Sequence, residues 1–259
     1  MLVFGSLISG SSGNATIISD GTTTLLTDCG MSGKGLASAL DNIGMKIDDI
    51  SGVLVTHEHI DHVKGVGVIA RRYGLKIYAS DGTISSMSDC KINDEQLISI
   101  SADKDFQIGT IGIKPFSIPH DAAEPLGFSY FSGEQKVSLA TDIGEINDYI
   151  YDNIKGSGTV LLESNHDVEM LRYGSYPYSL KQRILGKSGH LSNENAAKTA
   201  VKLAKEGTEH LLLGHLSREN NLPDIAYMTT TNALKNNNIN ENDIDLKIAD
   251  RYTPTIIRV

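Results

Sequence analysis

Five short apolar runs in this chain each stop at an acidic or imidazole side chain. Runs of this length, bounded by turn residues, predict buried strands. Side chains at the carboxyl ends of neighbouring strands meet in one crevice, so the pattern predicts a sheet-based fold with one polar site. A single buried histidine is usually a core residue whose hydrogen bonds are satisfied, but five runs that each end in a titratable side chain favour a functional site. The runs GVLVT, IKPFSIP, KVSLAT, TVLL and LLLG stop at His57, His120, Asp142, Glu163 and His215.

The segment HEHIDH, residues 57–62, follows the first of these runs directly. Titratable groups at the edge of a core cost free energy unless an opposite charge compensates them, and a metal ion is the obvious compensator. His57 and His59 face the same side of an extended segment, which suits one ion. Asp61 and His62 suit a second ion. Imidazole and carboxylate ligands without thiolate favour Zn²⁺, Mn²⁺ or Fe²⁺, in incomplete sites of the kind that hydrolytic centres need.

The remaining pattern predicts an α/β or α+β chain, with strands alternating with helices. We expect three opening strands within residues 1–9, 15–19 and 23–28, and helices over residues 33–44, 62–74 and 195–207. Asn193 is expected to cap the last helix and Gly207 to end it. The polar stretch at residues 232–245 is interpreted as a loop.

Composition favours one domain over residues 1–259, since 40% apolar content supports a large core and no linker divides the chain. The start lacks a basic region and a long apolar run, so no signal peptide is expected, and no run approaches the ~18 apolar residues of a membrane span. Two cysteines, Cys29 and Cys90, are too few for a disulfide scaffold, and a reduced, cytoplasmic location fits them best.

The formal charge of −9 argues against a broad surface that coats nucleic acid. It leaves a phosphodiester substrate open, because two divalent cations add four positive charges at the site itself. Two basic clusters exist, and both are interpreted as solvated faces. They are Lys181 with Arg183 and Lys187, and Arg71 with Arg72.

The H-x-H-x-D-H motif after a strand resembles the signature of the metallo-β-lactamase fold, with SIPHDA, ATDIG and LLLGHLS following in that superfamily's order. The resemblance implies a four-layer αββα sandwich, two mixed sheets with helices outside. It also implies two divalent ions, Mn²⁺ or Zn²⁺ with Fe²⁺ as a further choice. The implied ligands are His57, His59 and His120 for one ion, Asp61, His62 and His215 for the other, and Asp142 between them.

The segments LLES and GHLSNENAAKTA are similar to those of the tRNA 3′-processing ribonucleases of this superfamily. In those enzymes a glutamate and a histidine pair to move protons at the scissile phosphate. The resemblance implies that Glu163 orients His190 and that His190 protonates the leaving oxygen. His166, in ESNHD, is expected to touch a substrate phosphate or the metal surroundings, or to lie at the surface. His210 is expected at a strand start, without a role.

Over nearly the whole chain, LISGSSGNAT, PHDAAEPLGF, ESNHD and GHLSRENN resemble the YycJ/WalJ-type family. That resemblance implies a 5′-to-3′ exonuclease acting on double-stranded DNA. The Ser/Gly loop, with Ser12 and Asn14, offers small side chains and N–H groups to an anion, or is an ordinary turn. His166 and Ser217 complete the expected substrate-binding residues, and Ser217 is also placed to steady His215.

The mechanism expected from these residues is phosphodiester hydrolysis at a two-metal centre. Asp61 ligates and orients the nucleophile, and His190, backed by Glu163, acts as the general acid. The alternatives are a small-molecule hydrolase of the same fold, acting on a cyclic phosphodiester, thioester or lactone, and an RNA-processing nuclease. Two alternatives of other classes are a di-iron redox protein and a non-catalytic scaffold stabilised by metal. The redox protein would usually need a carboxylate at the position of His59, and the scaffold would have no hydrolytic activity.

Overall fold

The computed structural model describes residues 2–258, which fall into two compact units. Of these residues, unit 1 comprises 2–117, 122–134 and 250–258, and unit 2 comprises 118–121 and 135–249. The expectation of one domain over residues 1–259 stays a prediction. Along the part of the chain that is described, no helix has both the length and the apolar character to cross a bilayer.

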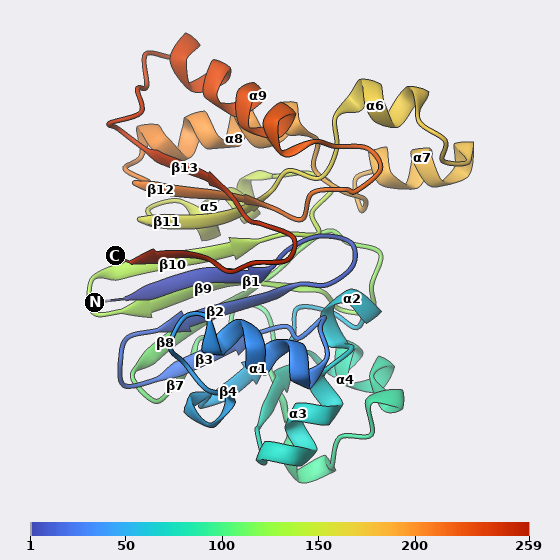
Figure 1. The fold of residues 1–259 in the computed structure, drawn as a ribbon, viewed down its shortest axis with the longest axis vertical. Coiled ribbons are helices and arrows are strands. Elements are labelled where there is room, and N and C mark those ends of the chain that lie inside the picture. Colours follow the sequence, from blue (N-terminus) through green and yellow to red (C-terminus); the bar gives the residue numbers. More distant parts are fainter. Residues whose placement is uncertain (1, 259) are drawn as a thin grey trace. The chain divides into compact units, whose positions relative to one another are not determined.

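A seven-stranded mixed sheet forms the centre of unit 1, in the order β14-β1-β2-β3-β4-β5-β6 (Figure 1). The three expected opening strands are present and antiparallel, and β3 to β6 run parallel. The strands are β1 (Val3–Ile8), β2 (Ala15–Ser19), β3 (Thr24–Thr27), β4 (Gly52–Leu54), β5 (Ile77–Ala79), β6 (Leu97–Ser99) and β14 (Thr255–Arg258).

Helices pack on this sheet through one apolar face each. Helix α1 (Gly33–Asp41) buries Leu36 and Leu40, and α3 (Val66–Tyr73) buries Ile69, all in one cluster with strand residues such as Val53. The helix expected over residues 62–74 is broken into α2 (Ile60–Val63) and α3 at residues 64 and 65. Unit 1 also holds α4 (Asp81–Ser86) and the antiparallel strands β7 (Phe106–Ile108), β8 (Ile111–Ser117) and β9 (Leu126–Ser132).

Unit 2 is built on four parallel strands, each paired with the next one along the chain. They are β10 (Gln135–Ala140), β11 (Thr159–Glu163), β12 (His210–Gly214) and β13 (Asp245–Ile248), with helices α5 (Asp148–Ile154), α6 (Val168–Tyr173), α7 (Tyr178–Leu185), α8 (Asn193–Lys205) and α9 (Pro223–Asn236). All five runs that were expected to be strands are strands. Because parallel strands share a direction, the residues that end β10, β11 and β12 lie at one edge.

Two local expectations in unit 2 are corrected. The N-cap of α8 is Ser192, whose hydroxyl accepts from the Asn195 N–H, and Asn193 is the first helical residue. The stretch expected to be a loop at residues 232–245 begins inside α9, because that helix buries Leu234 on its inner face.

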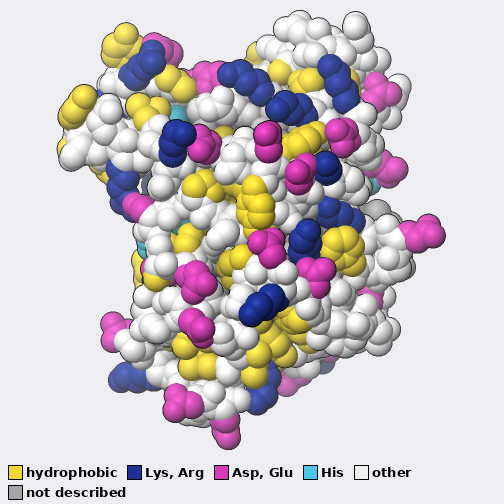
Figure 2. Space-filling view, turned by 180° about the vertical axis from the view of Figure 1, so that it is seen from behind, with side chains coloured by type: hydrophobic (Ala, Val, Ile, Leu, Met, Phe, Trp, Pro, Cys, Tyr) yellow, Lys and Arg dark blue, Asp and Glu magenta, His cyan; other side chains and the backbone are white. Residues whose placement is uncertain are grey.

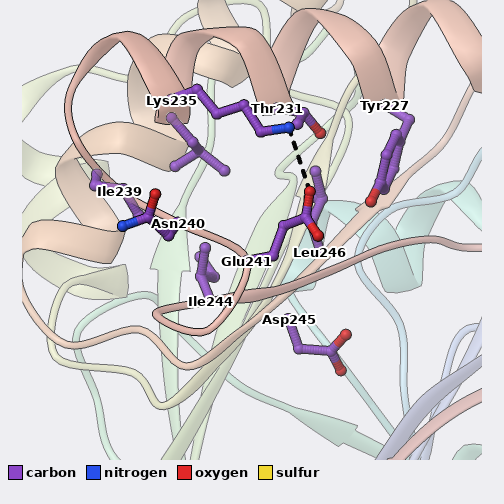
Figure 3. A pocket seen from close by; sticks show the side chains of 10 residues that line it. Tyr227, Thr231, Lys235, Ile239, Asn240, Glu241, Ile244, Asp245 and Leu246 are labelled. Atoms are coloured by element: carbon purple, nitrogen blue, oxygen red, sulfur yellow. Dashed lines mark ion pairs between the residues drawn. The ribbon is translucent and has the colours of Figure 1, made fainter.

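A cavity of about 210 Å³ lies among α9, the turn after it and β13 (Figure 3). Lys235 and Glu241 form an ion pair of 3.3 Å across its rim. In the strand register, Asp245 pairs with His210 at the start of β12, whereas Glu163 pairs with Gly214 at its end. The cavity therefore lies at the end of the strands opposite to the predicted site.

Candidate functional site

Unit 1 contains the HEHIDH cluster, which we define as His57, His59, Asp61 and His62. Strand β4 ends at Leu54, the chain bends at Thr56, and His59, with φ −59° and ψ 144°, caps α2. The side chains of His57 and His59 meet beside this connection, and Asp61 and His62 come from the first turn of the helix. His57 and His62 are fully buried.

Two imidazoles of the HEHIDH cluster direct nitrogens at one point. His57 Nε2 lies 3.0 Å from His59 Nδ1. Two nitrogens bound to one zinc ion at tetrahedral angles lie about 3.3 Å apart, given bonds of about 2.0–2.1 Å. The ring centroid of His62 lies 4.1 Å from that of His57. The distance of 3.0 Å between His57 Nε2 and His59 Nδ1 is therefore close to that of two nitrogens bound to one ion.

Asp28 orients the cluster and was not predicted from the sequence. His62 Nδ1 donates to Asp28 Oδ2 at 2.8 Å, and the Thr56 hydroxyl donates to the same oxygen at 2.8 Å. Asp28 Oδ1 accepts from the Thr56 N–H at 2.8 Å, and the residue adopts φ +60°. A carboxylate on one ring nitrogen fixes the tautomer of a metal-ligating histidine. The signal was present, because TTLLTD is another apolar run that stops at an acid.

The Ser/Gly loop packs onto the same residues. Asn14 Nδ2 lies 3.3 Å from Asp61 Oδ2 and 3.1 Å from His62 Nε2, so this side chain serves the cluster directly. A Cβ atom on Gly30 would lie 1.7 Å from the Asp61 carbonyl oxygen, so only glycine permits this approach. Ser12 is exposed at the tip of the loop, and its expected role in substrate binding stays a prediction.

Unit 2 contains the Glu163 cluster, defined as His120, Asp142, Glu163, His190 and His215. Glu163 Oε1 accepts from His190 Nδ1 and from His215 Nδ1, both at 2.8 Å. Its other oxygen accepts from the N–H groups of Ile143 at 2.8 Å and Leu191 at 3.1 Å. The expected pairing of Glu163 with His190 is present, and the second imidazole on the same oxygen was not anticipated.

Burial and charge oppose each other at Glu163. Burial alone would raise the pKa of this carboxyl group, but His190 and His215, through charge and hydrogen bonds, hold the pKa below its usual range. Glu163 therefore stays ionised while fully buried. At His120 burial lowers the pKa, against the pull of Asp142, so this imidazole stays neutral and able to ligate a cation.

Asp142 and His215 both leave their strands in the left-handed region, with φ +60° and +55°. Such backbone angles are unfavourable for residues with a Cβ atom and are concentrated at functional sites. Asp142 Oδ1 lies 3.4 Å from His215 Nδ1 and 3.9 Å from His120 Nε2. Asp142, Glu163, His190 and His215 each place a possible ligand atom within 4.8 Å of the others. Both oxygens of Glu163 accept hydrogen bonds, so this carboxylate is placed to orient the two imidazoles.

A buried amide holds the His215 backbone. Asn165 Nδ2 donates to the His215 carbonyl oxygen at 2.9 Å, and the Ser217 N–H donates to the Asn165 carbonyl oxygen at 2.8 Å. The Ser217 hydroxyl is buried and accepts from the Asn220 N–H at 3.2 Å. The expected role of Ser217 in substrate binding stays a prediction. Asn165 stabilises this turn and was missed, because a buried asparagine in ESNHD gives no separate signal.

His166 is 1% exposed, so the surface location left open from the sequence is wrong. Neither of its ring nitrogens has a hydrogen-bond partner, and burial lowers its pKa to about 4. A buried unpartnered imidazole is costly, and such groups in native proteins usually meet a water or a ligand. His210 begins β12 and bonds Asp245 at 3.2 Å, as expected of a structural residue.

The residues present fit divalent cations. Each cluster combines imidazoles with an acid and contains no thiol, the donor set that Zn²⁺, Mn²⁺ and Fe²⁺ share. In each cluster a carboxylate outside the expected ligand set holds a histidine by Nδ1, Asp28 for His62 and Glu163 for His215. Carboxylate-oriented imidazoles of this kind are typical of metal-dependent hydrolases.

Comparison with known proteins agrees with this class. The Beta-lactamase superfamily domain model matches residues 23–216. Exodeoxyribonuclease YycJ of Bacillus anthracis is 40% identical over 236 residues, covering 90% of this chain and 89% of the relative. Exodeoxyribonuclease WalJ of Streptococcus pneumoniae serotype 2 is 38% identical over 253 residues, covering 96% and 94%. The chain therefore belongs to the β-lactamase superfamily and, within it, to the family of YycJ and WalJ.

Solved structures show the fold. The metallo-β-lactamase fold protein YhfI from Bacillus subtilis matches with a TM-score of 0.74 over 99% of both chains, at 17% identity. The expected α/β fold of the metallo-β-lactamase type, with mixed sheets and helices, is confirmed, as is the family resemblance.

Proposed function

We propose that this chain is a metal-dependent phosphodiester hydrolase that degrades DNA from a 5′ end. Two observations support the reaction class: the histidine–carboxylate clusters, and membership of a family whose relatives YycJ and WalJ are named exodeoxyribonucleases. The arrangement that carries the proposal is Glu163 with two imidazoles on one oxygen, since it provides both an oriented ligand and a proton donor.

The proposal assigns two divalent ions, Mn²⁺ or Zn²⁺, to the two clusters together. His57, His59 and His120 would hold one ion, Asp61, His62 and His215 the other, and Asp142 both. When bound, such ions neutralise charge on the phosphoryl oxygens and activate a water molecule for attack. The ligand assignment follows from the family pattern and from the donor chemistry of each cluster.

His190 is proposed as the general acid for the departing sugar oxygen. Its Nδ1 donates to Glu163, and its side chain is 20% exposed, more than His215 or Glu163. Because Nδ1 is bound to Glu163, Nε2 is the ring atom left to give a proton to the leaving oxygen. Asp61 is proposed as a ligand that also orients the attacking water.

The location and partners belong to the same proposal. Cys29 is buried, Cys90 is half-buried, and neither forms a disulfide, which supports a reduced, cytoplasmic location. Burial raises the pKa of the Cys29 thiol to about 12, so it is an inert core residue. DNA is the proposed substrate because of the two relatives, and no membrane partner is proposed.

The test compares two leaving groups in the His190→Ala variant. Sugar alkoxide needs a proton as it leaves, whereas p-nitrophenolate does not. We expect kcat to fall by about 10²–10⁴-fold on 5′-labelled duplex DNA and much less on bis-p-nitrophenyl phosphate. His210→Gln, which removes another carboxylate-bound imidazole of unit 2, is the matched control and should retain wild-type rates. Hydrolysis of the small diester with no shortening of DNA by the wild type would assign the small-molecule alternative.

A further inference from the structure

The segment between Glu163 and His190 carries a hairpin of two helices with an unusual surface. We define the α6–α7 hairpin as residues 168–187. It contains four lysine and arginine residues against one acid, in a chain whose formal charge is −9. Three of the ten tyrosines of the chain lie in it. The local charge is thus opposite to that of the whole chain.

Large aromatic side chains of the hairpin lie in solvent. Tyr173 is 85% exposed and Tyr178 is 77% exposed, and Leu185 is also exposed. A hollow of about 340 Å³ opens beside Tyr178, with Arg172 and Lys181 in its wall. In Figure 2, seen from behind, hydrophobic and basic side chains gather at the upper left corner, the part that Figure 1 labels α6 and α7. Proteins that bind single-stranded nucleic acid combine exposed aromatic rings, on which bases stack, with nearby basic side chains that contact the phosphates.

The hairpin is held rigidly. Lys181 Nζ donates to the carbonyl oxygens of Arg172 at 2.8 Å and Gly174 at 2.7 Å, which ties α7 to the end of α6. Leu171 and Ile184 anchor the two helices in the interior. A rigid platform loses less conformational entropy when it binds a ligand than a mobile loop does.

The end of α7 is also fixed against the Glu163 cluster. The His190 N–H donates to the Ile184 carbonyl oxygen at 2.9 Å. A Cβ atom on Gly189 would lie 2.3 Å from the carbonyl oxygens of Arg183 and Ile184, so only glycine allows this approach. Arg183 pairs with Asp121, whose other oxygen lies 3.5 Å from His120 Nε2. The hairpin is therefore continuous with the residues proposed to act on the phosphate.

Two of the four basic side chains of the hairpin are available for exchange. Arg172 pairs with Glu169 at 2.9 Å and Lys187 with Glu145 at 3.5 Å, and all four side chains are largely exposed. Exposed ion pairs contribute little net free energy, so a phosphate can replace the carboxylate at small cost.

We propose that the α6–α7 hairpin grips the DNA strand beside the scissile bond, with Tyr173 and Tyr178 stacking on unpaired bases and Arg172 and Lys187 contacting phosphates. The inference rests on the proposed function, because it names the surface by which that site holds its polymer substrate. Unpaired bases are the matching chemistry, since only they expose a π-face to an aromatic ring.

Binding of a fluorescein-labelled, phosphorothioate single-stranded 20-mer, followed by fluorescence anisotropy, tests this directly. The Tyr173→Ala/Tyr178→Ala double variant should bind about tenfold more weakly or worse, and Tyr→Phe at both positions should restore affinity because the rings remain. Tyr252→Ala, at another tyrosine exposed by 70%, is the matched control in unit 1 and should bind as the wild type does. The ratio of kcat/KM on DNA to that on bis-p-nitrophenyl phosphate should fall in the double Ala variant by the same factor.

A second double variant tests the proposed phosphate contacts of Arg172 and Lys187. Arg172→Gln with Lys187→Gln should lower the slope of log K against log salt concentration by about 1.4, or about 0.7 for each phosphate of a single strand that the variant no longer neutralises. Unchanged affinity in the double Ala variant, together with an unchanged salt slope here, overturns the hairpin proposal. Continued DNA degradation by the wild type would then leave the proposed function intact, whereas a wild type that hydrolyses no phosphodiester overturns the proposed function itself.

Discussion

In each of the two clusters, one buried carboxylate orients an imidazole. Asp28 and Glu163 each bind the Nδ1 atom of a histidine, so that the tautomer of His62 and of His215 is set by a buried carboxylate. Of these two carboxylates, only Glu163 was predicted from the sequence. Glu163 was predicted as the partner of His190, but its bond to His215 depends on the register of β11 and β12, which no local pattern gives.

Replacing Asp28 by asparagine should weaken metal binding by about 10–100-fold, because the amide cannot accept from His62 as a carboxylate does. Isothermal titration of metal-stripped protein with Mn²⁺ measures this. Asp41→Asn, an exposed acid at the end of α1, should bind as the wild type does. Equal affinity in the Asp28→Asn variant would show that this carboxylate does not orient a ligand.

His166 should make stability depend on pH. Its folded pKa of about 4 lies below the unfolded value near 6.5, so the unfolded chain binds more protons as the pH falls below about 6.5. The free energy of unfolding is therefore lost progressively towards pH 4. Between pH 7.5 and pH 5 the wild type should lose about 2 kcal/mol more than His166→Gln. Urea unfolding at the two pH values measures it, and parallel curves for both proteins would refute the assignment. His210→Gln is the control.

At the scale of elements, strand ends and close approaches position the site. The five strands that end in polar groups were predicted because each is a short apolar run with a titratable stop, a local property. The break between α2 and α3 and the helical start of residues 232–245 were not, since they depend on contacts remote in sequence, such as the bond from the Gly65 N–H to the Cys29 carbonyl oxygen. The same holds for Gly30, whose close approach to Asp61 spans 31 positions. The Ser192 cap is a local bond to the Asn195 N–H, and it was missed because Asn193 beside it is an equally suitable capping residue.

Gly30→Ala should destabilise the contact between the segment after β3 and α2. The added Cβ would lie 1.7 Å from a backbone oxygen, which cannot move as a flexible side chain would. We expect a loss of roughly 2 kcal/mol or more in the free energy of unfolding. Gly33→Ala, where the nearest atom lies 3.6 Å away, is the matched control and should be neutral or slightly stabilising. Thermal and urea unfolding of both variants settle the comparison, and equal stability would contradict it.

At the scale of the whole molecule, the chain is acidic, and the proposed DNA substrate is also negatively charged. Locally positive regions of the protein can nevertheless bind phosphates. On the face drawn in Figure 2, acidic and basic side chains are interspersed. The formal charge of −9 argues against a broad basic surface, and this face shows none. Affinity for DNA would then come from two divalent ions and from the basic α6–α7 hairpin. Degradation of DNA should accordingly fall steeply with salt, whereas hydrolysis of a small diester should respond weakly.

The central claim, that the HEHIDH and Glu163 clusters together form a hydrolytic two-metal centre, is tested most directly by metal content and activity measured on one sample. Metal-stripped protein is reloaded with Mn²⁺ or Zn²⁺, and bound ions per chain are counted by mass spectrometry while 3′-labelled duplex DNA is offered. We expect two ions per chain, no shortening of DNA before reloading, and shortening in proportion to ions bound. Protein that holds no divalent ion, or that holds two and hydrolyses neither DNA nor bis-p-nitrophenyl phosphate, would contradict it.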